Sequence, residues 1–266
     1  MSVENDFSVG SIPRHIIDLA IPMTLAQLVQ MAYNLVDRIY IGHLPGTSSI
    51  ALTGLGLTFP IITIIMAFTN LFSTGSVALY SIARGKQDAA AERRYMENVF
   101  LLLLLTSVVV MVLCFAFMHP ILYLFGASDE TYPYSAAYLR IYLIGTPLVM
   151  LATGMNGFIN AQGYGKTGMF TILIGAIINI ILDPIFIFVL DLGISGAAIA
   201  TVISQLLSVI WVMAFLTSRR SLTPLRVRQA RIDLTATKQI TQLGIAGFVM
   251  QATNGIVQVA ANNMLG

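Results

Sequence analysis

The sequence has few charged residues and almost no cysteine. Of its 266 residues, 10% are charged and 57% are hydrophobic, whereas soluble domains contain about 25% charged residues. The single cysteine, Cys114, excludes a disulfide framework. The sequence also contains no cluster of metal ligands, no nucleophile paired with a base and no phosphate-binding loop. We therefore expect neither an enzyme nor a bound cofactor.

The hydrophobic residues form long runs separated by short polar segments. A helix needs about 20 apolar residues to cross a bilayer core of roughly 30 Å, whereas a strand of a membrane barrel needs about half as many. The runs predict an all-α, polytopic integral membrane protein. We place seven spans near residues 16–41, 51–80, 98–118, 136–160, 168–190, 194–216 and 240–266.

The basic residues favour one side of this predicted membrane protein. They occur in every second connection, and the alternate connections contain no Lys or Arg. By the positive-inside rule, the N-terminus and the basic connections lie in the cytoplasm. Topology already accounts for these charges, so we expect contact with membrane lipid and no binding of nucleic acid. The residues are Arg84, Lys86, Arg93, Arg94, Lys166, Arg219, Arg220, Arg226, Arg228, Arg231 and Lys238.

The run from residue 171 to residue 190 contains an acid that an ordinary span would avoid. Asp183 follows Asn179 by four residues, so both lie on one helix face, and Pro184 comes next. An acid inside a span costs about 2.5–3.5 kcal/mol on insertion scales, so its default interpretation is functional. Repair of a kink at the proline is the alternative, but Ser or Thr could do that without the charge.

The first span contains a polar stripe. Met23, Gln27, Gln30, Asn34 and Asp37 recur at spacings of three and four residues and therefore share one helix face. In lipid, such a stripe must face other helices or a water-filled cavity. The next residue, Arg38, points about 100° away from Asp37, so we expect it to reach the outer headgroups.

Four polar residues on four spans are predicted to lie in the outer half of the membrane. Asp37 and Tyr138 lie near the outer ends of their spans, Thr201 is about 10 Å from its own outer end, and Asp183 is roughly 22 Å into the fifth span. No Lys or Arg is predicted deep enough to pair with the acids. The pair therefore either holds a proton or binds a cation through oxygen ligands. If the cation is sodium, Asp37, Asn179, Asp183 and Thr201 are its predicted ligands.

The seventh span resembles the first when the sequence is shifted by 224 residues. Gln27 then aligns with Gln251, and the matching basic flanks support a repeat of six spans with parallel topology. We expect a fragment of a protein with about twelve spans, whose main partner is a second lobe. The predicted units are a six-helix lobe (1–217), a basic interlobe loop (218–238) and the first helix of the second lobe (239–266).

Several motifs resemble those of the multidrug and toxic compound extrusion (MATE) transporters, nearest their DinF-like and MepA-like prokaryotic branch. They are Ile21-Pro22, YNLVDRIYIG (33–42), GLGLTFPI (54–61), TGSVALYSIARGKQD (74–88), NGFINAQG (156–163) and NIILDPIFIF (179–188). The resemblance implies two six-helix lobes around a central cavity. It also implies ion coupling at Asp37, Tyr138, Asn179, Asp183 and Thr201. Arg38 departs from the family, where a small or apolar residue is commoner.

These observations together predict a secondary antiporter in the cell membrane of a prokaryote. It would export amphipathic, often cationic, organic compounds in exchange for H⁺ or Na⁺. The residues predicted to line the substrate cavity are Gln27, Gln30, Tyr33, Asn34 and Asn156. The alternative is a flippase of lipid-linked saccharides, although a large anionic lipid carrier would favour basic residues in the cavity and none is evident.

Overall fold

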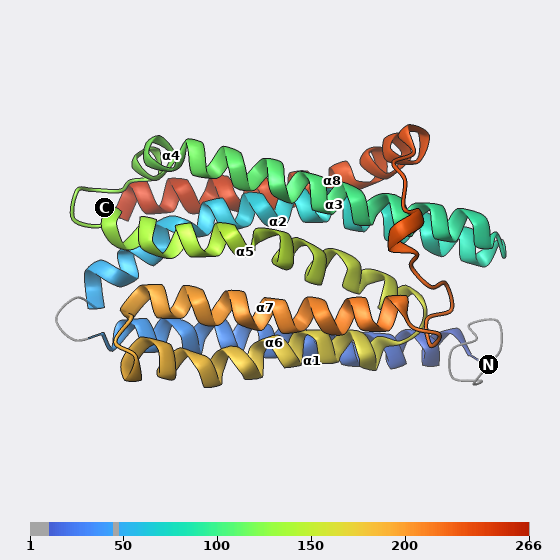
Figure 1. Ribbon diagram of the computed structural model, residues 1–266, viewed down its shortest axis with the longest axis horizontal. Helices are drawn as coiled ribbons and strands as arrows, with labels where there is room; N and C mark the ends of the chain where they lie inside the picture. Colours follow the sequence, from blue (N-terminus) through green and yellow to red (C-terminus); the bar gives the residue numbers. More distant parts are fainter. Residues whose placement is uncertain (1–10, 45–47, 266) are drawn as a thin grey trace.

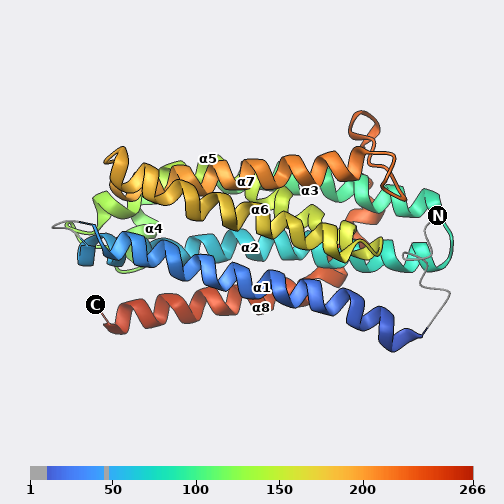
Figure 2. The ribbon, with the colours of Figure 1, turned by 90° about the horizontal axis from the view of Figure 1, so that it is seen from below.

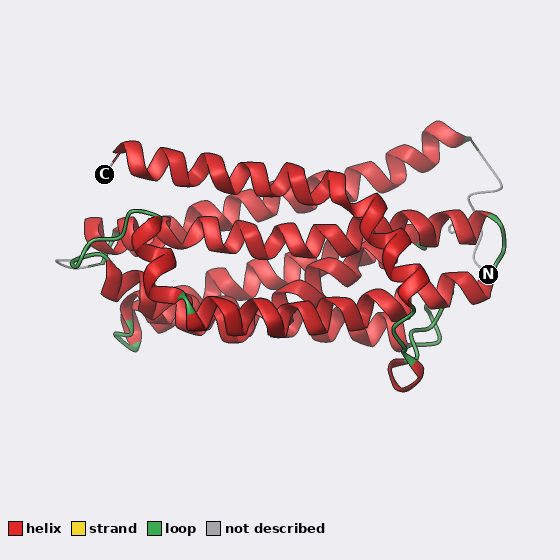
Figure 3. Ribbon diagram, turned by 90° about the horizontal axis from the view of Figure 1, so that it is seen from above, coloured by secondary structure: helices red, strands yellow, loops and turns green. Residues whose placement is uncertain are grey.

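The computed structural model describes residues 11–44 and 48–265, and the elements in this part of the chain are helices (Figure 1, Figure 3). Seven of them are long and apolar enough to cross a membrane, as the sequence predicts. The α-helices are α1 (Ile12–Gly42), α2 (Ser48–Gly85), α3 (Ala89–Ala116), α4 (Met118–Leu124), α5 (Tyr132–Ala161), α6 (Gly165–Pro184), α7 (Gly193–Thr217) and α8 (Leu234–Leu265). A π-helix (Ile185–Val189) and a 3₁₀ turn (Val227–Gln229) complete the set.

The long helices lie in two layers (Figure 1). One layer contains α1, α6 and α7, and the other contains α2, α3, α5 and α8. Helix α5 connects the layers because it packs against α2 and α3 as well as α7. The buried apolar core lies mainly along α2, α3, α5 and α7. Helix α8 runs in the same direction as α1, as a parallel repeat requires (Figure 2).

Helices α2 and α8 approach each other closely, and glycines make this approach possible. A Cβ atom on Gly244 would lie 1.7 Å from the Leu71 carbonyl oxygen, and one on Gly75 would lie 2.0 Å from the Ile240 carbonyl oxygen. Small residues at a crossing let two membrane helices pack backbone against backbone. Any side chain at these two glycines would therefore separate α8 from α2.

Several helix ends differ from the predicted spans, most of all the start of α3, which lies at Ala89 instead of near residue 98. Helix α6 ends at Pro184, and the chain continues as a π-helix, because proline supplies no amide hydrogen to the α-helical ladder. Helix α8 begins at Leu234, several residues before the predicted start. The side chain of Asp233 caps it, accepting hydrogen bonds from the amides of Thr235 and Ala236 at 2.8 and 3.1 Å. The short helix α4 was not predicted.

The segment between α7 and α8 is anchored to the helices. The amide of Leu222 and the hydroxyl of Ser221 both donate to Oε1 of Gln162, at 2.8 and 3.0 Å. The hydroxyl of Thr223 donates to the buried carboxylate of Glu92. The sequence predicts an interfacial basic loop here, and these contacts fix its first half against the ends of α3 and α5.

Candidate ion and substrate site

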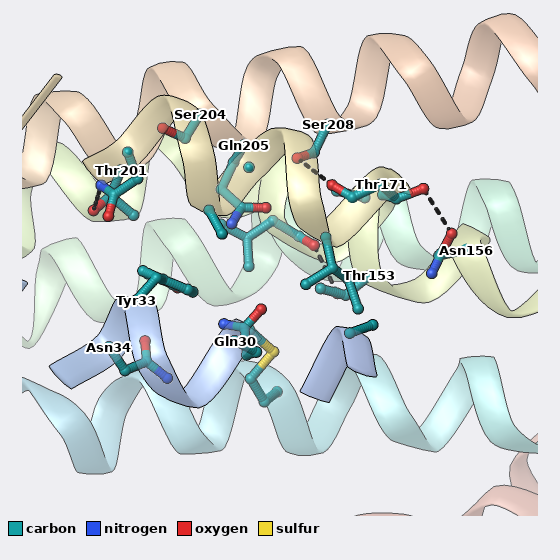
Figure 4. A pocket seen from close by; sticks show the side chains of 18 of the residues that line it. Gln30, Tyr33, Asn34, Thr153, Asn156, Thr171, Thr201, Ser204, Gln205 and Ser208 are labelled. Atoms are coloured by element: carbon teal, nitrogen blue, oxygen red, sulfur yellow. Dashed lines mark hydrogen bonds between the residues drawn. The ribbon is translucent and has the colours of Figure 1, made fainter. Parts of the chain in front are cut away.

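A cavity of about 750 Å³ lies between the two layers. Its wall includes residues of α1, α2, α5, α6, α7 and α8. Figure 4 shows side chains of α1 on one side of it and polar side chains of α7 on the other. The predicted stripe of α1 lines the cavity completely, through Met23, Gln27, Gln30, Asn34 and Asp37, and so do the predicted residues Tyr33, Tyr138, Asn156, Asn179 and Thr201.

At one end of the cavity, which we call the acid end, Asp37 and Asn179 line the wall, and Asp183 lies buried behind Asn179 without lining the cavity. The side-chain amide of Asn179 donates to Oδ1 of Asp183 at 3.1 Å and lies 3.5 Å from the hydroxyl oxygen of Thr201. Asp183 is fully buried and Asn179 is 2% exposed. Asn179 and Asp183 therefore share one face of α6, as their spacing predicts.

The second acid reaches this cluster from α1. The carboxyl groups of Asp37 and Asp183 are close enough to interact directly. Tyr138, which is 4% exposed, lies near both Asp37 and Thr201 and stacks against Tyr142 with 6.0 Å between ring centroids. The structure thus brings together the five residues that the sequence associates with ion coupling.

Three oxygen atoms at the acid end have no hydrogen-bond partner among the described residues. They are Oδ1 of Asp37, Oδ1 of Asn179 and Oδ2 of Asp183, and all three are buried. The other buried atoms without a partner belong to Arg93, Glu97, Asn160 and Gln162. A buried polar atom left unpaired costs about 1–3 kcal/mol, so a group of three calls for a ligand.

The chemistry of these atoms limits what that ligand is. The described residues contain no group of three His, Cys, Asp or Glu side chains able to hold a metal ion. The described residues that line the cavity also include no His or Cys, so it offers no thiolate or imidazole ligand for a transition metal. Carboxylate, amide and hydroxyl oxygens are the donors that hard cations prefer, and a carboxylate pair can also hold a proton. The site therefore suits a proton or a hard cation.

The other end of the cavity, which we call the amide end, contains Asn156, Thr171 and Ser208 (Figure 4). The hydroxyl of Thr171 donates to Oδ1 of Asn156 at 2.8 Å, and Nδ2 of Asn156 donates to the Gly168 carbonyl at 3.2 Å. The hydroxyl of Ser208 donates to the Thr171 carbonyl at 3.1 Å. These bonds join α5, α6 and α7, so both the carbonyl oxygen and the NH₂ group of the Asn156 side chain are engaged in helix packing.

The structure contradicts the expected position of Arg38. Its guanidinium lies over the ring of Phe59 from α2, 4.6 Å from the ring centroid, and both side chains line the cavity. The planar guanidinium stacks favourably on an aromatic face, and α2 presents one within reach. A basic residue is therefore present in the cavity, and the sequence-based argument that none exists is wrong.

Sequence reasoning also missed the contribution of α2 and α8. Thr63 donates to Oε1 of Gln258 at 3.0 Å, and Gln251 and Gln258 both line the cavity. The repeat contained the signal for these two glutamines, because the shift of 224 residues aligns Gln251 with Gln27 and Gln258 with Asn34. The polar stripe of α1 thus has a counterpart on α8 that faces the same cavity.

The sequence profile of the MatE family matches residues 22–185 of the chain. The chain belongs to the MatE family. Among its curated relatives are the multidrug export protein MepA of Staphylococcus haemolyticus, 29% identical over 259 residues, and that of Staphylococcus saprophyticus, 26% identical over 260. Both alignments cover 97% of this chain and 57% of the relative, so the chain spans little more than half the length of these MATE proteins.

Solved MATE structures share the fold. The outward-facing conformation of a multidrug resistance MATE transporter superposes with a TM-score of 0.84 at 26% identity, over 91% of this chain and 53% of the other. A MATE protein in complex with MaD5 superposes with a TM-score of 0.86 at 25% identity, over 94% of this chain and 57% of the other. The family resemblance and the all-helical fold predicted from the sequence are therefore confirmed.

Proposed function

We propose that this chain forms the ion-coupling lobe of a secondary antiporter that exports amphipathic organic compounds in exchange for H⁺ or Na⁺. The observation that carries the proposal is the acid end, where two acids and an amide leave three buried oxygens unpaired beside a large cavity. The coupling ion is the missing partner of these oxygens. Asp37 and Asp183 carry it, and Asn179, Thr201 and Tyr138 orient them.

The cavity wall supports an amphipathic substrate. It combines amides on the α1 stripe with the aromatic rings of Tyr33, Tyr138 and Tyr142 and the thioethers of Met23 and Met66. Aromatic faces attract cationic nitrogen, and methionine adapts its shape to varied apolar groups. The relatives are named multidrug export proteins, which agrees with a wall of this kind.

Ion binding is coupled to substrate binding because α1 carries side chains for both. Asp37 belongs to the same helix as Gln30 and Asn34, and Pro22 gives that helix a place to bend. Charged carboxylates repel each other, and neutralisation by an ion lets them approach, so α1 changes position when the ion binds. Linkage is reciprocal. If the ion weakens substrate binding, the substrate weakens ion binding by the same factor.

The positions of the basic connections indicate how the chain is oriented in the membrane. We place the N-terminus of α1 and the basic connections in the cytoplasm of a prokaryotic cell, with the acid end toward the outside. The second lobe expected in the whole protein supplies the opposite wall of the transport path, and the two lobes alternate access to it. A lipid-linked saccharide flippase remains the second candidate, and Arg38 in the cavity is the observation that favours it.

Transport in proteoliposomes tests the proposed function. A protein that joins this chain to its second lobe is reconstituted, and uptake of ethidium is followed while a pH gradient and a sodium gradient are imposed separately. The proposal expects one gradient to drive ethidium movement against its concentration. Transport that ignores both gradients would contradict it, and movement of a lipid-linked saccharide without ethidium transport would favour the flippase.

A further inference from the structure

Two opposite charges lie next to each other at the acid end of the cavity. Among the described residues that line it, Asp37 and Arg38 are the charged ones. Uncharged amides, hydroxyls, aromatic rings and aliphatic groups make up the rest of that wall. The charges of the two side chains therefore decide which charged groups of a substrate the cavity accepts.

The guanidinium of Arg38 is held in place but is not neutralised by contact. Phe59 supports one face of it at 4.6 Å, and the side chain is exposed. The structure records an ion pair between Arg94 and Asp233 but none for Arg38 within the described residues. Asp37 is near enough to feel its charge, yet Oδ1 of Asp37 is left without a hydrogen bond. The donors of Arg38 are thus available to a ligand.

We propose that Arg38 is a specificity-determining residue that makes the cavity prefer aromatic zwitterions, which carry a carboxylate as well as a cationic nitrogen, over purely cationic analogues. This inference rests on the proposed function. The carboxylate of such a compound pairs with the guanidinium of Arg38, its aromatic frame lies among Phe59 and the cavity tyrosines, and its cationic nitrogen faces Asp37.

Physical chemistry favours this pairing in two ways. A guanidinium and a carboxylate form two parallel, charge-assisted hydrogen bonds, which are stronger than bonds between neutral groups. The same guanidinium repels a compound whose only charge is positive, so that Arg38 also selects against pure cations. Phe59 limits the motion of the guanidinium, so less conformational freedom is lost when a carboxylate binds.

A pair of dyes isolates the effect of one carboxylate. Rhodamine 110 carries a free carboxylate and a cationic xanthylium frame, and rhodamine 123 is its methyl ester and is purely cationic. Binding of each dye to the chain in nanodiscs is measured by fluorescence anisotropy. The variants are Arg38→Gln, Arg38→Lys and, as a matched control, Arg140→Gln, which changes an exposed arginine of α5 that does not line the cavity.

The ratio of the two dissociation constants is the deciding quantity, because it does not depend on how much of a variant is folded. We expect wild type and Arg140→Gln to bind rhodamine 110 more tightly than rhodamine 123. Arg38→Gln should reduce that preference about fivefold or more, and Arg38→Lys, which retains the charge but not the two parallel hydrogen bonds or the stacking on Phe59, should keep part of it.

Three results would overturn the inference alone. They are an equal affinity of wild type for both dyes, a ratio unchanged in Arg38→Gln, and a preference lost as fully in Arg38→Lys as in Arg38→Gln. In these three cases, binding of rhodamine 123 by wild type would still support the proposed function, because this dye is a cationic organic compound. Failure of wild type to bind either dye would overturn the inference and also count against the proposed drug cavity.

Discussion

The acid end and the amide end of the cavity contain similar polar groups but use them differently. At the amide end, Asn156, Thr171 and Ser208 satisfy one another across three helices, and one oxygen of this region, Oδ1 of Asn160 beside Gly168, has no partner among the described residues. At the acid end, Asn179 and Thr201 leave buried oxygens of two acids and an amide without partners. The comparison teaches that polar residues within a membrane span gain a functional meaning when their contacts are incomplete. Complete contacts indicate packing.

The largest expected effect comes from Asp183. Replacement by Asn keeps the size of the side chain but removes the charge that, in the proposed mechanism, the coupling ion neutralises. We expect Asp183→Asn to abolish gradient-driven ethidium export from proteoliposomes when the chain is joined to its second lobe. Asp191→Asn is the matched control, because it changes an exposed acid whose left-handed backbone Asn tolerates. Full-rate export by Asp183→Asn would remove the acid end from the mechanism.

The second expected effect is a change in how ions alter drug affinity. In wild type, protons or sodium should weaken binding of a cationic drug, typically by 5–150-fold, because they cancel the negative charge that attracts it. Asp37→Asn should lose most of that response. Drug titrations at several pH values, with and without sodium, measure it. If wild type and Asp37→Asn respond alike, Asp37 takes no part in coupling and Asp183 carries the ion alone.

A smaller effect is expected at the amide end. Asn156→Ala leaves the Thr171 hydroxyl and the Gly168 carbonyl without their partner, and we expect a loss of about 1 kcal/mol in unfolding free energy, as for interhelical bonds in membranes. Thermal unfolding in detergent measures the change. The ion response of drug binding should survive in this variant, in contrast to Asp37→Asn. Loss of that response without loss of stability would assign Asn156 to the ion site.

The smallest effect is expected at the side-chain hydrogen bond between Thr63 of α2 and Gln258 of α8. Thr63→Val keeps the shape of the side chain and removes its hydrogen bond to Gln258. Such bonds average about 0.6 kcal/mol in membrane proteins, so stability should fall only slightly. The ion response should not change. A loss as large as that of Asn156→Ala would show that the contact with α8 organises the cavity.

Much of the site was predictable from helix geometry. Spacings of three and four residues place Gln27, Asn34 and Asp37 on one face of α1 wherever that helix lies, and the same rule joins Asn179 to Asp183. The rule does not say which helices become neighbours. Arg38 was therefore assigned to the headgroups, because its partner Phe59 comes from α2. Thr171 was missed for a similar reason, since only its contact with Asn156 distinguishes it from a packing residue.

Infrared difference spectroscopy on the purified chain tests the central claim most directly, because it observes the carboxyl groups themselves. The account predicts that acidification or sodium removal changes a carboxyl band in wild type. The band should weaken in Asp37→Asn and disappear in Asp37→Asn combined with Asp183→Asn, while Asp191→Asn should resemble wild type. The account would be contradicted if the double variant showed the same band change as wild type. It would also be contradicted if neither protons nor sodium changed any carboxyl band of wild type.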